Sequence, residues 1–89
     1  MGHIMKIHYF AAARAAAGTP SETLDGTFNT LDDVLAHAAQ LHEGSTDSGM
    51  SLADVFERCT YLVDGRRAER DATVASATRV DVLPPFAGG

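Results

Sequence analysis

The chain has 89 residues, enough for one small domain with a single hydrophobic core. Its hydrophobic content of 45% and charged content of 21% are ordinary for a folded globular protein. With 12 acidic against 7 basic residues the net charge is −5, and the arginines between Arg58 and Arg70 alternate with acids. The sequence therefore lacks the basic face that nucleic-acid binding requires.

The single cysteine, Cys59, excludes an internal disulfide and suits a reducing compartment. No apolar run approaches the about 20 residues of a membrane span, and the N-terminus lacks the apolar segment of a secretion signal. The sequence predicts a cytoplasmic protein with no membrane partner. Residues 1–4, Met-Gly-His-Ile, look like an expression leader, so the domain is expected to span Met5 to Leu83.

The first predicted element is a strand from Met5 to Phe10, where the residue types alternate. Met5, Ile7 and Tyr9 fall on one face, and the other face is only partly polar. This pattern predicts a half-buried strand.

The alanine-rich segment Ala11 to Ala17 has good helix composition but is too short to persist alone. It is expected to be a turn or loop that ends at Gly18. A weaker strand follows from Thr19 to Leu24, since Pro20 is tolerated at a strand start or edge. The first two strands are expected to form a hairpin-like pair.

The most secure helix starts after Thr30, a residue type that caps helices, with acids in the first turn at Asp32 and Asp33. Gly44 is the expected C-cap, which places the helix at about 31–43. Apolar residues recur at helical spacing: Leu31, Val34, Leu35, Ala38 and Leu41 or His42.

A polar connector, Gly44 to Gly49, separates this helix from a second, shorter one. Ser51 and Asp54 form a capping-box pattern at its start. Its apolar stripe consists of Leu52, Val55, Phe56 and Cys59.

Histidine and cysteine side chains have the chemistry for catalysis or metal binding, and three of them fall in or near the predicted helices. His37 and His42 are five residues apart, so they do not share a helix face as a metal pair would, and both are expected at the surface or boundary. Cys59 is expected in the core because free cysteine is among the most buried residue types.

The last third of the chain predicts three strands. Tyr61-Leu62-Val63 is a buried strand, Asp64-Gly65 is a tight-turn signal, and Arg66 to Arg70 follows it. Residues 71–78 are expected to form a loop. The final strand is Arg79 to Leu83, where Val80 and Val82 alternate with the other residues.

This element order predicts an α+β domain of the β-grasp, or ubiquitin-like, type. A four- to five-stranded mixed sheet would be covered by one main helix plus a short helix. The first and last strands are expected to pair in parallel at its centre.

Residues 84–89, Pro-Pro-Phe-Ala-Gly-Gly, are expected to form a flexible tail. The prolines end the strand, and glycine can thread a narrow channel. From Leu83 the tail can extend roughly 20 Å. Either this is a frayed end, or the terminal carboxylate of Gly89 is itself the reactive group.

Two stretches carry a resemblance to a known family. The opening, Lys6-Ile7-His8-Tyr9-Phe10-Ala11-Ala12-Ala13-Arg14, and the ending, Leu83-Pro84-Pro85-Phe86-Ala87-Gly88-Gly89, are similar to those of the small, sulfur-carrying subunit of molybdopterin synthase. That subunit belongs to the MoaD and ThiS group of ubiquitin-like proteins. A Gly-Asp-x-Val turn is common before the last strand there, but this chain has Ala77-Thr78-Arg79-Val80.

The resemblance implies a mechanism in which an E1-like adenylyltransferase activates Gly89 with ATP. A sulfur donor then replaces AMP and leaves a C-terminal thiocarboxylate. The tail, with Gly88 and Gly89 as its reactive end, enters the large subunit of molybdopterin synthase in a heterotetramer and gives sulfur to cyclic pyranopterin monophosphate. The catalytic side chains would belong to that partner, and the chain would bind no permanent cofactor or metal.

Contact with the partner is expected at the root of the tail, from Leu83, Pro84, Pro85, Phe86 and Ala87. The alternative for Leu83 and Phe86 is packing on the chain's own sheet. Arg66 and Arg70 either lie near the tail or form a solvated hairpin.

Other functions remain open at this point. They are a sulfur carrier for thiamine or cysteine biosynthesis, a ubiquitin-like modifier that joins Gly89 to lysines of target proteins, and a binding module with an inert tail.

Overall fold

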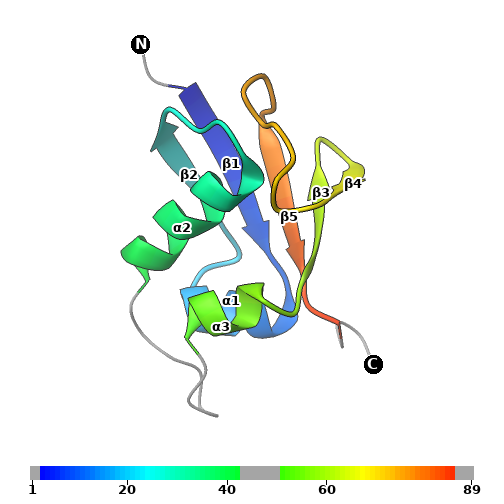
Figure 1. Ribbon diagram of the computed structural model, residues 1–89. Coiled ribbons are helices and arrows are strands. Elements are labelled where there is room, and N and C mark those ends of the chain that lie inside the picture. Colours follow the sequence, from blue (N-terminus) through cyan, green and yellow to red (C-terminus); the bar gives the residue numbers. More distant parts are fainter. Residues whose placement is uncertain (1–2, 43–50, 86–89) are drawn as a thin grey trace.

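The computed structural model describes residues 3–42 and 51–85 (Figure 1). The elements in chain order are β1 (His3–Tyr9), α1 (Ala11–Ala17), β2 (Ser21–Gly26), α2 (Leu31–Leu41), α3 (Leu52–Phe56), β3 (Thr60–Val63), β4 (Arg66–Ala68) and β5 (Arg79–Leu83).

The five strands form one mixed sheet in the order β2-β1-β5-β3-β4. β1 and β5 are parallel, with Ile7 opposite Val80, and all other pairs are antiparallel. Figure 1 shows α2 across one face of the sheet, and α1 with α3 near the end where β5 finishes. This arrangement confirms the predicted α+β, β-grasp architecture.

The core lies between the sheet and α2. The side chains that β1 and β5 send to this face are at most 1% exposed: Met5, Ile7, Tyr9, Val80 and Val82. The helix contributes buried Leu31, Val34, Leu35 and Ala38. The alternation predicted from the sequence is therefore confirmed in both central strands.

The strand β1 begins earlier than predicted, because residues set aside as a leader take part in pairing. His3 lies opposite Gly26 and Ile4 opposite Asp25. The Ile4 side chain is 63% exposed, so Ile4 adds strand pairing and little core.

The prediction of a loop over Ala11 to Ala17 is wrong, because this segment is the helix α1. Its buried alanines, Ala13, Ala16 and Ala17, face the core, and α1 packs against α3. Gly18 ends the helix with a left-handed φ of 78° and donates its N–H to the Arg14 carbonyl at 2.9 Å. Tertiary packing thus stabilises a helix that is too short to form in isolation.

The helix α2 begins as predicted and ends two residues early. Thr30 caps it through a reciprocal pair of bonds with Asp33. The last residue is Leu41, which is 53% exposed rather than part of the apolar stripe, and His42 is the C-cap. Gly44 lies outside the described residues.

The short helix α3 has the predicted capping box between Ser51 and Asp54. It ends at Phe56, so Cys59 lies beyond the helix rather than on its stripe. None of the helices in the described ranges is long and apolar enough to cross a membrane.

The predicted turn between β3 and β4 is confirmed. Asp64 and Gly65 have φ values of 50° and 84°, the left-handed pair that a two-residue hairpin of type I′ requires. β4 is shorter than predicted, ending at Ala68, and β2 begins at Ser21, after Pro20.

Candidate functional site

The candidate site is the root of the C-terminal tail, where β5 ends. β5 lies between β1 and β3, and its last residue, Leu83, is opposite Thr60. The tail therefore leaves from a central strand that is paired on both sides (Figure 1). Such a strand holds the start of the tail in a fixed position relative to the whole domain.

The two prolines differ in their environment. Pro84 is buried and Pro85 is exposed, while Leu83 is half-buried. The packed body therefore extends through Pro84, one residue beyond the expected boundary. Phe86, Ala87, Gly88 and Gly89 lie outside the described residues, so their predicted roles stay predictions.

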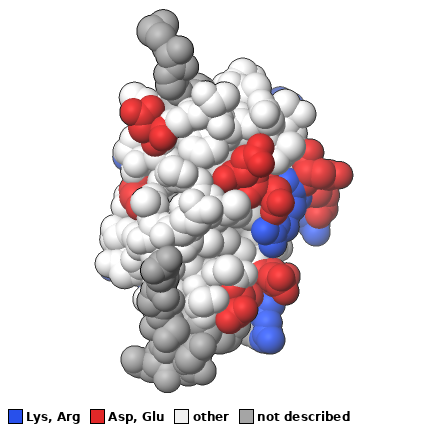
Figure 2. Space-filling model, turned by 60° about the vertical axis from the view of Figure 1, so that its left-hand side comes forward, with Lys and Arg blue, Asp and Glu red and all other residues white. Residues whose placement is uncertain are grey.

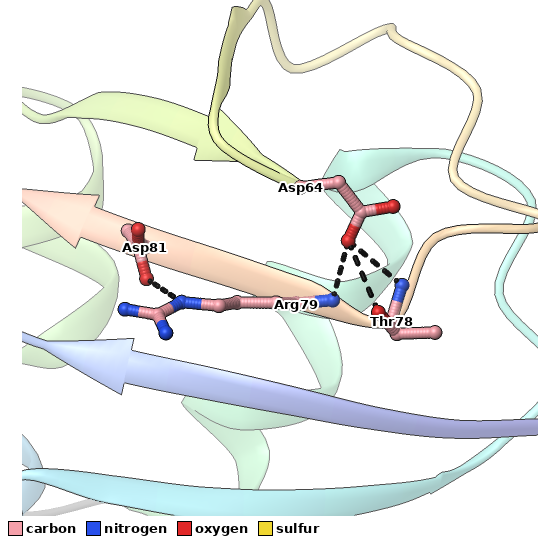
Figure 3. A network of polar contacts seen from close by, with 4 residues as sticks. All are labelled: Asp64, Thr78, Arg79 and Asp81. Atoms are coloured by element: carbon pink, nitrogen blue, oxygen red, sulfur yellow. Dashed lines mark hydrogen bonds and ion pairs between the residues drawn. The ribbon is translucent and has the colours of Figure 1, made fainter.

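The start of β5 is fixed by Asp64 from the β3–β4 turn (Figure 3). One oxygen of its carboxylate, Oδ1, accepts from the backbone N–H of Thr78 at 3.1 Å, the Thr78 hydroxyl at 3.2 Å and the N–H of Arg79 at 3.0 Å. In return the Asp64 N–H donates to the Arg79 carbonyl at 2.9 Å. These bonds therefore fix Thr78 and Arg79, the two middle residues of the segment Ala77-Thr78-Arg79-Val80.

The far end of β5 is held by the end of β1. The N–H of Phe10 donates to the Val82 carbonyl at 3.2 Å, which places Phe10 beside Leu83 in the parallel register. The Phe10 ring is 40% exposed. An apolar surface therefore adjoins the tail, which suits protein contact. Leu83 was predicted to lie here; Phe10 was missed, although its position in the opening motif was a signal.

Polar side chains occupy the face of β1 and β5 opposite the core. Arg79 Nε donates to Asp81 Oδ1 at 2.8 Å, and the Asp81 side chain is only 11% exposed against 50% for Arg79. Burial, helped by the Arg79 and Lys6 cations and opposed by Asp81, lowers the pKa of His8 below its ordinary 6.5. The lowered pKa favours the neutral form of His8.

A second polar cluster ties α2 to the β1–β2 pair. The Tyr9 hydroxyl donates to Glu22 Oε2 at 2.6 Å, and His42 Nε2 lies 2.5 Å from the same oxygen. Burial, then the bond to Glu22, raises the pKa of Tyr9. His37 packs edge-to-face on Phe28 instead. Within residues 3–42 and 51–85, no group of three His, Cys, Asp or Glu side chains is arranged to hold a metal.

Cys59 is partly buried against the core, with its Sγ–H donating to the Val55 carbonyl at 3.1 Å. Burial raises the pKa of the thiol to about 11. Because the thiolate is the nucleophilic form, this environment makes Cys59 unreactive near neutral pH.

The two hairpin arginines have different roles. Arg66 is exposed on β4, whereas Arg70 forms an ion pair with Asp32 at 2.6 Å and so holds the chain after β4 against the start of α2. The structure therefore places Arg70 in a contact within the domain rather than on an exposed strand face.

The fold agrees with solved structures from archaea at low sequence identity. SAMP1 from Haloferax volcanii is 22% identical, with a TM-score of 0.73 over 98% of this chain and 100% of that one. The small archaeal modifier protein 1 of Methanosarcina acetivorans is 21% identical, with a TM-score of 0.74 over 100% and 99%. A putative molybdopterin converting factor, subunit 1, from Pyrococcus furiosus is 22% identical, with a TM-score of 0.68 over 93% and 98%.

Sequence comparison identifies the family. No curated protein matches this chain. The model of the ThiS family matches residues 7–89, which includes the last three residues of β1, the four other strands of the sheet and the terminal Gly-Gly. The chain therefore belongs to the ThiS family of ubiquitin-like β-grasp proteins.

Proposed function

We propose that this protein is the sulfur-carrier subunit of molybdopterin synthase and that the C-terminal carboxylate of Gly89 carries the sulfur. Membership of the ThiS family supports a carrier or modifier of the ubiquitin-like type. The name of the Pyrococcus furiosus neighbour, putative molybdopterin converting factor, subunit 1, supports the particular pathway.

The proposal rests on the way in which the C-terminal tail is attached to the folded domain. A Gly-Gly terminus follows a central strand whose start is bonded to Asp64 and whose end is bonded to Phe10. Because Pro84 is buried, the chain from Pro84 to Gly89 can span at most about 17 Å. The tail thus starts at a fixed point on the domain and ends in two glycines, which have no bulky side chain. The reacting atoms would be those of the main chain.

The chemistry follows from the poor reactivity of a carboxylate. In an E1-like partner, a Gly89 carboxylate oxygen attacks the α-phosphorus of ATP and pyrophosphate leaves. A sulfur nucleophile then attacks the acyl carbon and AMP leaves. Hydrosulfide gives the thiocarboxylate directly, whereas a persulfide donor gives an acyl disulfide, from which a thiol releases the thiocarboxylate by forming a disulfide with the donor. In the large synthase subunit the thiocarboxylate transfers its sulfur to cyclic pyranopterin monophosphate, and water restores the carboxylate. Two carriers in a heterotetramer would supply the two dithiolene sulfurs.

A second candidate is a ubiquitin-like modifier that forms isopeptide bonds between Gly89 and lysines. The names of the two SAMP1 neighbours favour it, because SAMP1 stands for small archaeal modifier protein 1. Both candidates share the acyl adenylate and differ in the nucleophile that follows. A carrier for thiamine or cysteine biosynthesis would share the thiocarboxylate as well.

Reconstitution separates these candidates. The chain is incubated with ATP, the E1-like enzyme and a sulfur donor, and then with the large synthase subunit and cyclic pyranopterin monophosphate. We expect molybdopterin to form, and none with a chain that ends at Ala87. Covalent ladders on other proteins would identify a modifier. A thiocarboxylate that the large subunit does not consume would identify a carrier for another pathway.

A further inference from the structure

The strand β2 forms one edge of the sheet, and its neighbour in the sheet is β1. Lys6, which lies opposite Thr23, donates its backbone N–H to the Thr78 carbonyl at 2.9 Å, in the direction of β5. Lys6 and Thr23 therefore form a pair without mutual backbone hydrogen bonds, and the N–H and C=O of Thr23 point away from β1. Asp25 lies two residues further along β2, so its backbone groups point outward as well.

This outer edge has few of the features that usually block a sheet edge, which are lysine, proline, a bulge or a covering segment. β2 (Ser21–Gly26) contains no lysine, arginine or proline, and its residues pair with β1 in one continuous register. The side chains of Thr23 and Asp25 are exposed, and Asp25 has no ion-pair partner within residues 3–42 and 51–85. An extended segment is therefore able to add to β2 as a further strand.

The charge around β2 indicates which segment fits. Residues 15–57, which include β2 and α2, contain eight of the 12 acidic residues and no lysine or arginine. Figure 2 shows carboxylates spread over the side of the molecule that carries β2 and α2, with Lys and Arg mainly along one border. Asp25 brings this negative charge onto the edge itself. A basic segment is attracted to this side of the molecule, and an acidic one is repelled.

The acidic end of β2 lies far from the root of the tail. β2 is antiparallel to β1, and β1 is parallel to β5, so Asp25 lies near the end of the sheet where β5 begins (Figure 1). On β1, Ile4 is opposite Asp25, and Phe10, beside the root of the tail, is six residues later, a distance of about 20 Å along the strand. A segment bound at Asp25 therefore leaves the tail accessible.

We propose that the outer edge of β2 binds an extended, basic segment of a partner protein by strand addition. The segment lies antiparallel to β2, exchanges backbone hydrogen bonds with Thr23 and Asp25, and places a lysine or arginine opposite Asp25. The partner can thus hold the domain by one edge while the tail enters another protein. This interaction does not require that Gly89 carries sulfur, so it stands apart from the proposed function.

The probe is a capped synthetic peptide of alternating valine and lysine, added to the isotope-labelled full chain and followed by NMR. We expect the backbone amides of Thr23 and Asp25 to shift most. At a peptide concentration about ten times the dissociation constant, their hydrogen exchange should slow by about tenfold. Methylation of the peptide's lysine amides removes the N–H groups that face β2 and should abolish both changes. Methylation of its valine amides, which face away from β2, should preserve them.

Two variants of the full chain test the charge of the edge. Asp25→Lys places a like charge opposite the peptide's lysine and should weaken binding by about tenfold at low salt. Asp71→Lys changes the net charge equally, but Asp71 follows β4, the strand at the other edge of the sheet, so binding should weaken by less than about twofold. A peptide of alternating valine and glutamate should bind the wild-type chain more weakly than the lysine peptide. Thermal unfolding of each variant checks that the domain is folded.

The proposal fails if the peptide leaves the amides of Thr23 and Asp25 unshifted, or if the two methylated peptides bind equally well. Equal losses for Asp25→Lys and Asp71→Lys would also overturn it, because net charge rather than the edge would then determine binding. If the amides of Thr23 and Asp25 shift with protein concentration in the absence of peptide, a second copy of this chain occupies the edge, and the assignment to a basic segment is wrong.

Discussion

The two faces of β1 and β5 carry different properties within the same pair of strands. At the pair Ile7 and Val80 both side chains are 0% exposed, whereas one residue earlier Lys6 and Arg79 are both exposed. Because side chains alternate along a strand, one set of positions builds the core and the other set lies on the opposite face of the sheet. The C-terminal tail follows β5 directly in the chain.

The largest expected effect is on sulfur transfer and comes from removing the two C-terminal glycines. A chain that ends at Ala87 should lose sulfur transfer completely, because the reacting carboxylate is displaced by two residues. Its melting temperature should match that of the full chain within error, as measured by circular dichroism. A large drop in melting temperature would show that the tail is part of the folded body.

The next effect separates the two faces directly. Ile7→Ala removes a fully buried side chain and should lower the free energy of unfolding by about 2–5 kcal/mol. Lys6→Ala, on the same strand but on the face turned away from the core, should change it by less than about 0.5 kcal/mol. Urea denaturation measures both. Comparable losses would contradict the division between the faces.

The hydrogen-bonded cluster of Tyr9, Glu22 and His42 joins α2 to the β1–β2 pair, and its contribution to stability can be measured. Glu22→Gln weakens the acceptor shared by Tyr9 and His42 and should cost about 1–2 kcal/mol in the free energy of unfolding. In a double-mutant cycle with His42→Gln the two losses should not add, because both changes remove the same contact. Additive losses would show that the contact contributes nothing.

The smallest expected effect is on the pH dependence of stability and comes from Cys59, which is partly buried against the core. Its pKa of about 11 lies above the ordinary 9.0, so its contribution to stability is complete below pH 9 and is lost as pH rises through 11. Unfolding followed from pH 8 to pH 11 should show a smaller decline in Cys59→Ala than in the wild type. Fast alkylation of the native thiol at pH 7 would contradict the buried environment.

The sequence predicted the structural features that depend on neighbouring residues and missed those that depend on contacts between distant segments. The N-caps of α2 and α3 and the Asp64-Gly65 turn rest on neighbouring residues, and all three were predicted. The helix α1 was missed because its stability comes from packing against α3, which no local pattern encodes.

The candidate site shows the same division. The terminal motif predicts partner contacts at Leu83 and the two prolines, and this stays a prediction. The bonds from Asp64 to Thr78 and Arg79 join residues 14 and 15 positions apart, so they were not predictable from the turn alone. The burial of Pro84 and the exposure of Phe10 beside Leu83 depend in the same way on the parallel pairing of distant strands.

The most direct test of the central claim is the mass of the C-terminal peptide after incubation with ATP, the E1-like enzyme and a sulfur donor. The account predicts that the peptide ending in Gly89 gains the mass difference of one oxygen exchanged for sulfur. An unchanged terminal peptide would contradict it. So would sulfur added at Cys59 without loss of oxygen, which would make a persulfide, rather than the terminus, the carrier.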